Sequence, residues 1–363
     1  MAARALEALL ADQNKGKRML GILAALFYIG CYTDEAHPEG LRIVDVDSAN
    51  GSIKLVESYK VNNPLYLAKS LDGRYLFCNE SSGLGSFTIG KNGKLSRRDY
   101  IDLGGRAMCH LAIMPNGTSI TWAAYTSGEA GLVEIADGKF IGEIRHDKQV
   151  GSGPHPAQKS AHCHMAEPTP DGEHYAVVDL GCDTVTVYPA KEKDQGTVHA
   201  TEPRGAGPRH IIFHPDGKLA FIITEHGRRL LVYEWNGAGL GKKLDEARSV
   251  PSDFVGLNQD SAIRFSPDGK RVIVSNRGFD ALTSFAFDQS TGKLGAAMFS
   301  PLPGSWPRDF VFIENSDLAI VTMERSGTLL TVRYDKETGR FTAVDTLHNF
   351  HRPVAVVAAA MEN

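Results

Sequence analysis

Four residues of types that bind anions and transfer protons lie at matched distances from turns in this chain. His164 and Arg209 each lie eight residues before the glycine of an Asp-Gly turn, and Glu225 and Arg277 each lie eight residues after one. Arginine binds a carboxylate or phosphate through a bidentate fork and can stabilise an oxyanion, while a histidine or glutamate can activate water. The four residues therefore predict acid–base chemistry on a small anionic substrate, with His164 or Glu225 as the general base.

Five further polar residues near these positions are candidates for substrate binding: His110, His162, Asp179, His210 and Arg308. His110 and His210 share the position seven residues before the turn glycine, where a purely structural role in a wall is an equal alternative. His162 and His164 are two residues apart and would project from one side of a strand, but two ligands do not define a metal site. We expect no metal, and no cofactor either, because the chain has no P-loop and no dinucleotide-binding fingerprint.

The alternative for the four main residues is structural, since charged side chains at strand ends often pair with one another or cap loops. The four residues lie at matched distances from the turns of three neighbouring repeat units. This regularity favours a shared site over separate structural roles. Counting in the same way from Asp317, which lies in the sixth turn, places Asp309 and Arg325 in the corresponding positions.

The turns that set these distances recur through the whole chain. Each lies between two apolar runs, and five of them contain a glycine: Gly73, Gly117, Gly172, Gly217 and Gly269. Units of roughly 40–50 residues with several short strands are typical of a β-propeller. In a propeller the first strand of each unit runs through the central channel and the second returns. The start of the first strand and the end of the second therefore lie at one mouth, where we expect the four residues to meet.

The six turns define six units, and the two ends of the chain supply a seventh. The segment from residue 353 onward resembles a first strand that lacks its partner, and residues 26–60 contain three apolar runs that lack a first strand. The prediction is an all-β fold, a seven-bladed β-propeller of four-stranded blades, with the ring closed by a blade built from both termini. Residues 1–18 are an N-terminal extension that is helical or frayed, and residues 19–363 form the propeller.

Composition excludes several classes of protein. The formal net charge of −4 over 363 residues gives no reason to expect nucleic-acid binding. No apolar run is long enough to span a membrane. Five cysteines without paired close spacing predict free thiols and a cytoplasmic location. The basic and apolar run before Cys31 imitates a lipoprotein signal, but cleavage there would cut the first predicted strand.

Several stretches resemble the lactonase family of seven-bladed propellers: YIGCYT at 28–33, GSGPHPAQKSAHCHM at 151–165, GAGPRHIIFHPDGK at 205–218 and SPDGKRVIVSNRG at 266–278. The resemblance runs from about Tyr28 to Ala359. That family includes propeller-type 6-phosphogluconolactonases and carboxy-cis,cis-muconate lactonizing enzymes. The resemblance implies that its active-site histidine, two arginines and glutamate correspond to His164, Arg209, Arg277 and Glu225. Departures at His155 and at Gln158-Lys159 leave the substrate open.

These observations together predict a lactone hydrolase acting on a small anionic sugar lactone, 6-phosphogluconolactone of the pentose phosphate pathway. One alternative is a cycloisomerase that forms a lactone from a carboxymuconate, with the same arginines binding its carboxylates. A second alternative is a non-enzymatic propeller that binds other molecules, as many propellers do. We expect no nucleic-acid or membrane partner, and an oligomer is compatible with the sequence.

Overall fold

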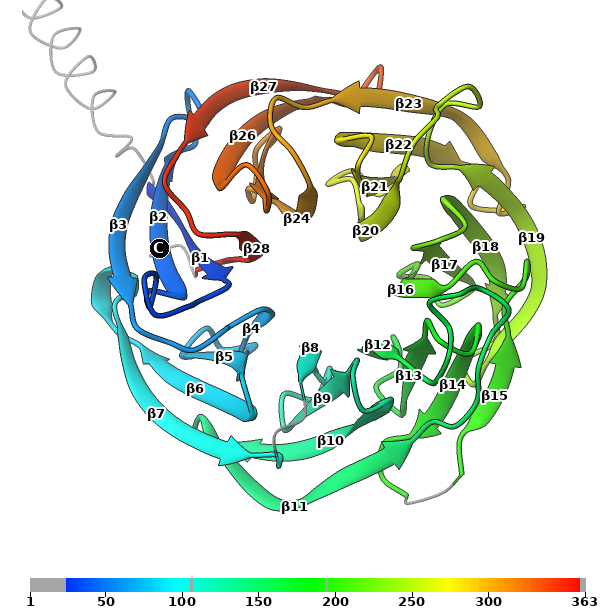
Figure 1. Cartoon of the computed structure of the whole chain (residues 1–363), viewed down its shortest axis with the longest axis horizontal. Helices are drawn as coiled ribbons and strands as arrows, with labels where there is room; N and C mark the ends of the chain where they lie inside the picture. Colours follow the sequence, from blue (N-terminus) through cyan, green and yellow to red (C-terminus); the bar gives the residue numbers. More distant parts are fainter. Residues whose placement is uncertain (1–23, 105–106, 193–194, 360–363) are drawn as a thin grey trace, which may run out of the picture.

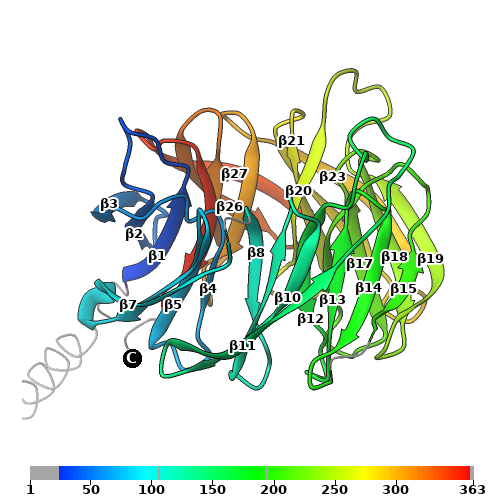
Figure 2. The same cartoon turned by 60° about the horizontal axis from the view of Figure 1, so that its bottom comes forward.

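The structure is a computed structural model that describes residues 24–104, 107–192 and 195–359. The predicted helix within residues 1–18 lies outside these ranges. Seven four-stranded antiparallel sheets, the blades, are arranged in a ring with the first strand of each nearest the centre (Figure 1). The predicted seven-bladed propeller is confirmed. In an oblique view, the strands run between the two faces of the ring (Figure 2).

The blades are numbered here in chain order. Blade 1 contains β28 (Pro353–Ala358), β1 (Ala24–Cys31), β2 (Leu41–Asp47) and β3 (Ile53–Tyr59), and blade 2 contains β4 (Leu67–Lys69), β5 (Tyr75–Glu80), β6 (Gly83–Ile89) and β7 (Leu95–Asp102). Blade 3 contains β8 (Met108–Ile113), β9 (Ser119–Ala124), β10 (Glu129–Ala136) and β11 (Lys139–Lys148), and blade 4 contains β12 (Cys163–Pro168), β13 (His174–Asp179), β14 (Thr184–Pro189) and β15 (Thr197–Ala200). Blade 5 contains β16 (Pro208–Phe213), β17 (Leu219–Thr224), β18 (Arg229–Trp235) and β19 (Leu240–Arg248). Blade 6 contains β20 (Gln259–Phe265), β21 (Arg271–Arg277), β22 (Ala281–Phe287) and β23 (Leu294–Pro301), and blade 7 contains β24 (Pro307–Phe312), β25 (Leu318–Met323), β26 (Thr328–Asp335) and β27 (Arg340–Leu347). A short 3₁₀ turn, η1 (Lys91–Gly93), precedes β7.

Blade 1 closes the ring in the predicted way. Strand β28 pairs antiparallel with β1, with Phe27 opposite Ala358 and Tyr28 opposite Val357. The blade also packs against its neighbour, because Ile29 of β1 belongs to the same buried cluster as Ile320 of blade 7. The two ends of the chain are therefore held together by strand pairing and by a shared core.

The repeated turns have a local cause. In blade 5 the turn glycine, Gly217, has a φ of 68°, which an L side chain adopts only with strain. The carboxylate of Asp216 accepts a hydrogen bond from the backbone N–H of Lys218 at 3.0 Å. An Asp-Gly pair supplies both the residue with positive φ and the carboxylate that accepts the backbone hydrogen bond. It therefore marks the link between the first and second strands of a blade.

The hydrophobic core lies between adjacent blades. All six residues of β17 are buried, because this middle strand is covered on both faces. Val178 of blade 4 and Ile222 of blade 5 belong to one buried cluster that spans the gap between their sheets. Each blade thus buries its faces only against its neighbours, which explains why the unit must repeat around a ring.

Two further expectations can be compared with the structure. All five cysteines are free, as predicted. No helix in the described ranges is long and apolar enough to cross a membrane.

Candidate active site

A pocket of about 290 Å³ lies at the mouth of the channel where first strands begin and second strands end. Its lining includes His164, Glu225, Arg277 and Arg308, and every blade contributes at least one residue to it. The volume is near the lower limit of about 300–1,000 Å³ typical of small-molecule sites. The pocket is therefore suited to a compact ligand on the axis of the ring.

β-Bulges place the key side chains of the first strands. In β16, Pro208 pairs with Thr224 and His210 pairs with Ile223, so Arg209 is an extra residue with no partner across the ladder. The same irregularity occurs in other first strands, where the extra residues include Cys109, His164 and Arg308. A bulge turns an additional side chain away from the regular alternation of a strand. The position eight residues before the turn is thus a bulge position, a cause that the sequence did not reveal.

The structure corrects the counting in blade 7. Phe312 pairs with Ala319 in this blade just as Phe213 pairs with Ala220 in blade 5, so Ser316 occupies the place of the turn glycine. Without a glycine to mark the turn, the sequence count started from Asp317, one residue too late. The residues at the two repeat positions are Arg308 and Glu324 rather than Asp309 and Arg325.

Glu225 is the centre of a buried hydrogen-bonded group. Its Oε2 accepts hydrogen bonds from Nε of Arg209 at 3.0 Å and from Nη2 of Arg277 at 2.7 Å. Its Oε1 accepts a hydrogen bond from Nε2 of Gln259 at 3.0 Å. Burial acts against the ionised carboxylate, but the charges of Arg277 and Arg209 outweigh it and hold the pKa of Glu225 far below its ordinary value. Glu225 is therefore an ion that fixes two guanidiniums.

The two arginines differ in their access to the pocket. Arg277 lines it, whereas Arg209 lies behind Glu225 with 3% of its surface exposed. Nη1 of Arg209 donates a hydrogen bond to the carbonyl oxygen of Ser261 at 2.5 Å. Burial and the nearby charge of Arg277 lower the pKa of Arg209 to about 9, so it still carries its charge at neutral pH.

His164 lines the pocket as a neutral imidazole. Its ring lies edge-on to Tyr125 at 5.6 Å and to His210 at 5.3 Å between ring centroids. Burial and the charge of Arg209 lower the pKa of His164 well below its ordinary value. Its Nδ1 is enclosed and has no hydrogen-bond partner among the described residues. The imidazole is thus uncharged where it borders the pocket, and its Nδ1 is shielded from solvent.

A second group of charges, contributed by blades 7 and 1, lies at the same pocket. Nη1 of Arg308 donates to Oε2 of Glu324 at 3.0 Å, and Nη2 of Arg352 donates to Oε1 at 2.6 Å. The Arg352 guanidinium also lies 3.9 Å from the ring centroid of Tyr32, which lines the pocket. Burial opposes the charge of Arg308, yet Tyr32 and Glu324 raise its pKa above the ordinary value. One carboxylate is again shared by two arginines.

The other predicted contact residues are more scattered. His210 and His110 continue from His164 as a line of rings, with His110 and His210 centroids 6.0 Å apart. His162 stacks on the pocket residue Tyr125, with ring centroids 4.4 Å apart. Asp179 is fully buried, and its Oδ1 accepts backbone hydrogen bonds, including one from His162 at 2.8 Å. Thus Arg308 lines the pocket and His162 borders it, while Asp179 does not reach it.

Several residues of the site were missed from the sequence: Tyr32, Cys109, Tyr125, Gln259 and Arg352. Tyr125 and Cys109 stand in the counted positions but have no charge to draw notice. Tyr32 and Arg352 belong to blade 1, which has no turn of its own to count from, because its first two strands come from opposite ends of the chain.

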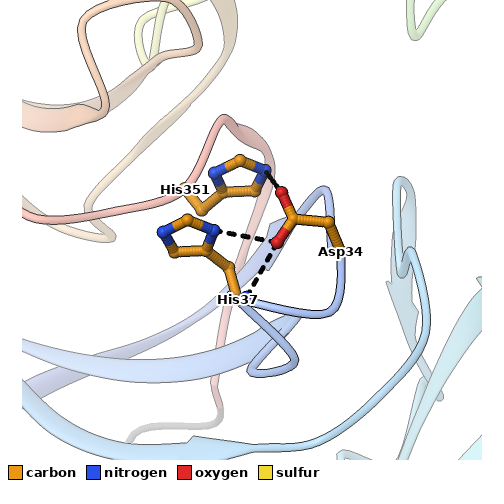
Figure 3. Close-up of side chains that lie close together, drawn as sticks. All are labelled: Asp34, His37 and His351. Carbon is orange, nitrogen blue, oxygen red and sulfur yellow. Dashed lines mark hydrogen bonds and ion pairs between the residues drawn. The ribbon is translucent and has the colours of Figure 1, made fainter.

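A cluster at the same mouth of the channel joins two loops of blade 1, the one after β1 and the one before β28. Asp34, His37 and His351 form the group in the described part of the chain whose ligand atoms lie close enough to hold a metal ion. The two imidazoles stack at 4.2 Å with their planes 4° apart, and both face the carboxylate of Asp34 (Figure 3). Parallel rings direct their nitrogens side by side rather than toward one point, so this arrangement suits a bridging carboxylate better than a shared cation.

Comparison with known proteins agrees with the fold. A family model described as "Lactonase, 7-bladed beta-propeller" matches residues 26–358. The chain is 32% identical over 340 residues to the 6-phosphogluconolactonase of Bacillus subtilis (strain 168), which covers 91% of this chain and 97% of that protein. The structure of the periplasmic gluconolactonase PpgL of Pseudomonas aeruginosa matches with a TM-score of 0.87 and 25% identity, covering 93% of this chain and 100% of that chain.

Fold and pocket thus define the class as propellers with a polar small-molecule site on the ring axis. The chain belongs to the lactonase family of seven-bladed β-propellers. This membership confirms the predicted family, and with it the prediction of an enzyme of the hydrolase class.

Proposed function

We propose that the protein hydrolyses a phosphorylated sugar lactone, 6-phosphogluconolactone, in the pentose phosphate pathway of the cytoplasm. The observation that carries the proposal is the clamp of Arg209 and Arg277 on Glu225 beside the neutral imidazole of His164. The relative named 6-phosphogluconolactonase supports the choice of substrate. Five free thiols suit a reducing compartment.

His164 is the general base in this mechanism. A water molecule attacks the carbonyl carbon of the lactone, and its proton passes to the imidazole. The carbonyl oxygen becomes negative and is stabilised by the pocket-lining guanidinium of Arg277. The bond between the carbonyl carbon and the ring oxygen then breaks, and the ring oxygen takes the proton from the imidazolium. The product is the open-chain acid, and His164 returns to its neutral state.

Glu225 has a different role from the one that a free carboxylate would have. Three donors already occupy its two oxygens, so a water molecule would have to displace one of them before it could transfer a proton to Glu225. It instead holds Arg277 in the orientation that meets the developing negative charge. Because Arg209 shares the same oxygen of Glu225, it fixes the carboxylate from behind.

The test is hydrolysis of freshly prepared 6-phosphogluconolactone by the purified protein, after subtraction of spontaneous lactone opening. A parallel assay with carboxymuconate tests the lactone-forming alternative. We expect His164→Ala to lower kcat by about 100-fold or more, the usual contribution of a general base. Turnover of carboxymuconate without hydrolysis of the lactone would overturn the proposal, and so would full activity in His164→Ala.

A further inference from the structure

We propose that Arg308 and Tyr32, supported by Glu324 and Arg352, form a subsite that binds the phosphate of the substrate. The inference rests on the proposed function and adds to it the group that selects a phosphorylated lactone. It starts from the duplication of an arginine–glutamate pair at equivalent positions of blades 5 and 7. Both pairs have the same 3.0 Å contact between guanidinium nitrogen and carboxylate oxygen.

The two pairs differ in what they offer to a ligand. The side chain of Arg209 is 3% exposed and lies behind Glu225, whereas that of Arg308 is 20% exposed and lines the pocket. In blade 7 it is the carboxylate that is enclosed, since the side chain of Glu324 is 4% exposed. The pair in blade 7 therefore presents its positive member to the pocket.

Glu324 orients this positive surface. Its two oxygens are divided between Arg308 and Arg352, so neither guanidinium can turn freely. The ring of Tyr32 lies near both guanidiniums, with its centroid 3.9 Å from the guanidinium carbon of Arg352 and 6.0 Å from that of Arg308. The backbone N–H of Tyr32 also donates to the carbonyl oxygen of Arg352. A fixed arginine with a phenol beside it is a preorganised site for a tetrahedral oxyanion.

Charge balance favours a phosphate over a neutral group. Each of the two clusters has two arginines and one glutamate, so the pocket wall carries a net charge of about +2 when all six are ionised. A phosphate monoester carries about −1.5 to −2 at neutral pH. One cluster meets the oxyanion that forms at the lactone carbonyl, and the other remains for an anion at the far end of the same six-carbon chain.

The experiment compares lactones that differ only at this far end. The substrates are 6-phosphogluconolactone, gluconolactone, and glucaro-1,5-lactone, which has a carboxylate in place of the phosphate-bearing carbon. We measure kcat/KM for each with the wild-type protein, Arg308→Gln and Arg308→Lys. The ratio of kcat/KM for the phosphorylated lactone to that for gluconolactone should fall at least tenfold in Arg308→Gln. It should fall less in Arg308→Lys, which keeps the charge but loses the fork.

Arg325→Gln is the matched control. Arg325 carries the same charge at the same mouth and is adjacent to Glu324 in the chain, but its guanidinium lies over the ring of Trp306. If long-range attraction alone selects the phosphorylated lactone, both arginine-to-glutamine variants should lower the ratio equally, and the subsite would be disproved. A preference for the carboxylate lactone over the phosphorylated one would also overturn the choice of phosphate.

A binding measurement separates failure of the subsite from failure of the proposed function. By titration calorimetry, 6-phosphogluconate should bind at least tenfold more tightly than gluconate, and Arg308→Gln should remove the difference. This result would support the subsite even if no lactone were hydrolysed. Hydrolysis of both lactones with equal kcat/KM, together with equal binding of the two acids, would disprove the subsite and leave the lactonase function standing.

Discussion

The arginine–glutamate pairs of blades 5 and 7 show how one repeat position acquires two properties. Both arginines occupy a bulge in the first strand, and both glutamates follow the second strand. In blade 5 the third charged partner is Arg277, with 5% of its side chain exposed; in blade 7 it is Arg352, with 50% exposed. The pKa is lowered for Arg209 and raised for Arg308. Burial, rather than the identity of the pair, therefore decides that Arg209 is held inside while Arg308 faces the pocket.

This comparison also shows what a sequence can and cannot give in a repeat protein. The fold was predictable because the Asp-Gly turns recur and because the unpaired first strand at residue 353 matches the unpaired strands at the N-terminus. Counting from turn glycines found His164, Arg209, Glu225 and Arg277. The same counting failed by one residue in blade 7, where serine replaces the glycine. Burial and bulges depend on contacts between blades, so no local pattern could have shown that Asp179 is buried outside the pocket lining.

The largest expected difference between the clusters is in stability. Removing one partner of a buried ion pair leaves an uncompensated charge and costs about 3–5 kcal/mol. Arg209→Met should therefore lower the free energy of unfolding by several kcal/mol, whereas Arg308→Met should lower it by about 1 kcal/mol, because Arg308 is partly solvated. Chemical denaturation of the two variants measures both values. Equal losses would show that burial does not distinguish the clusters.

The second difference concerns turnover. Glu225→Gln keeps the shape of the side chain but removes the charge that holds Arg277, so kcat should fall by about 100-fold. Glu324→Gln should act mainly on KM for the phosphorylated lactone, because Glu324 orients Arg308. Steady-state kinetics across pH separates positioning from base catalysis. A positioning role predicts that the residual activity of Glu225→Gln keeps the pH dependence of the wild-type protein, and a lost acidic limb would instead identify Glu225 as the base.

A third difference lies in the response to pH. Burial raises the pKa of Asp260, whose backbone carbonyl accepts a hydrogen bond from Arg277, to about 8. In the unfolded chain an aspartate has a pKa of about 3.9, so the folded state binds this proton more tightly. The resulting stabilisation is fully present below about pH 4 and is lost as pH rises through about 8. The free energy of unfolding should therefore decline between pH 5 and pH 9, and the decline should be smaller by at least about 1 kcal/mol in Asp260→Asn. Thermal unfolding of both proteins across this pH range measures the difference.

The control for this decline is Glu324→Gln. The pKa of Glu324 is lowered, because Arg308 and Arg352 overcome the effect of burial. Its contribution to the free energy of unfolding is therefore already complete above the pKa of an unfolded glutamate. Glu324→Gln should leave the decline between pH 5 and pH 9 in place. If this variant abolished the decline and Asp260→Asn did not, the assignment of the titrating group to Asp260 would be wrong.

The smallest expected effect is at the bulge residue without a charge. Cys109 occupies in blade 3 the position that Arg209 and Arg308 occupy in blades 5 and 7, and it lines the pocket. Burial raises the pKa of its thiol to about 12, and its Sγ lies 3.4 Å from the carbonyl oxygen of Cys163. A protonated thiol is a poor nucleophile. Cys109→Ala should therefore change kcat/KM by no more than about threefold, and iodoacetamide should react with Cys109 slowly at pH 8. A loss as large as that expected for His164→Ala would indicate covalent catalysis by the thiol, and the bulge of blade 3 would then belong to the catalytic machinery together with that of blade 4.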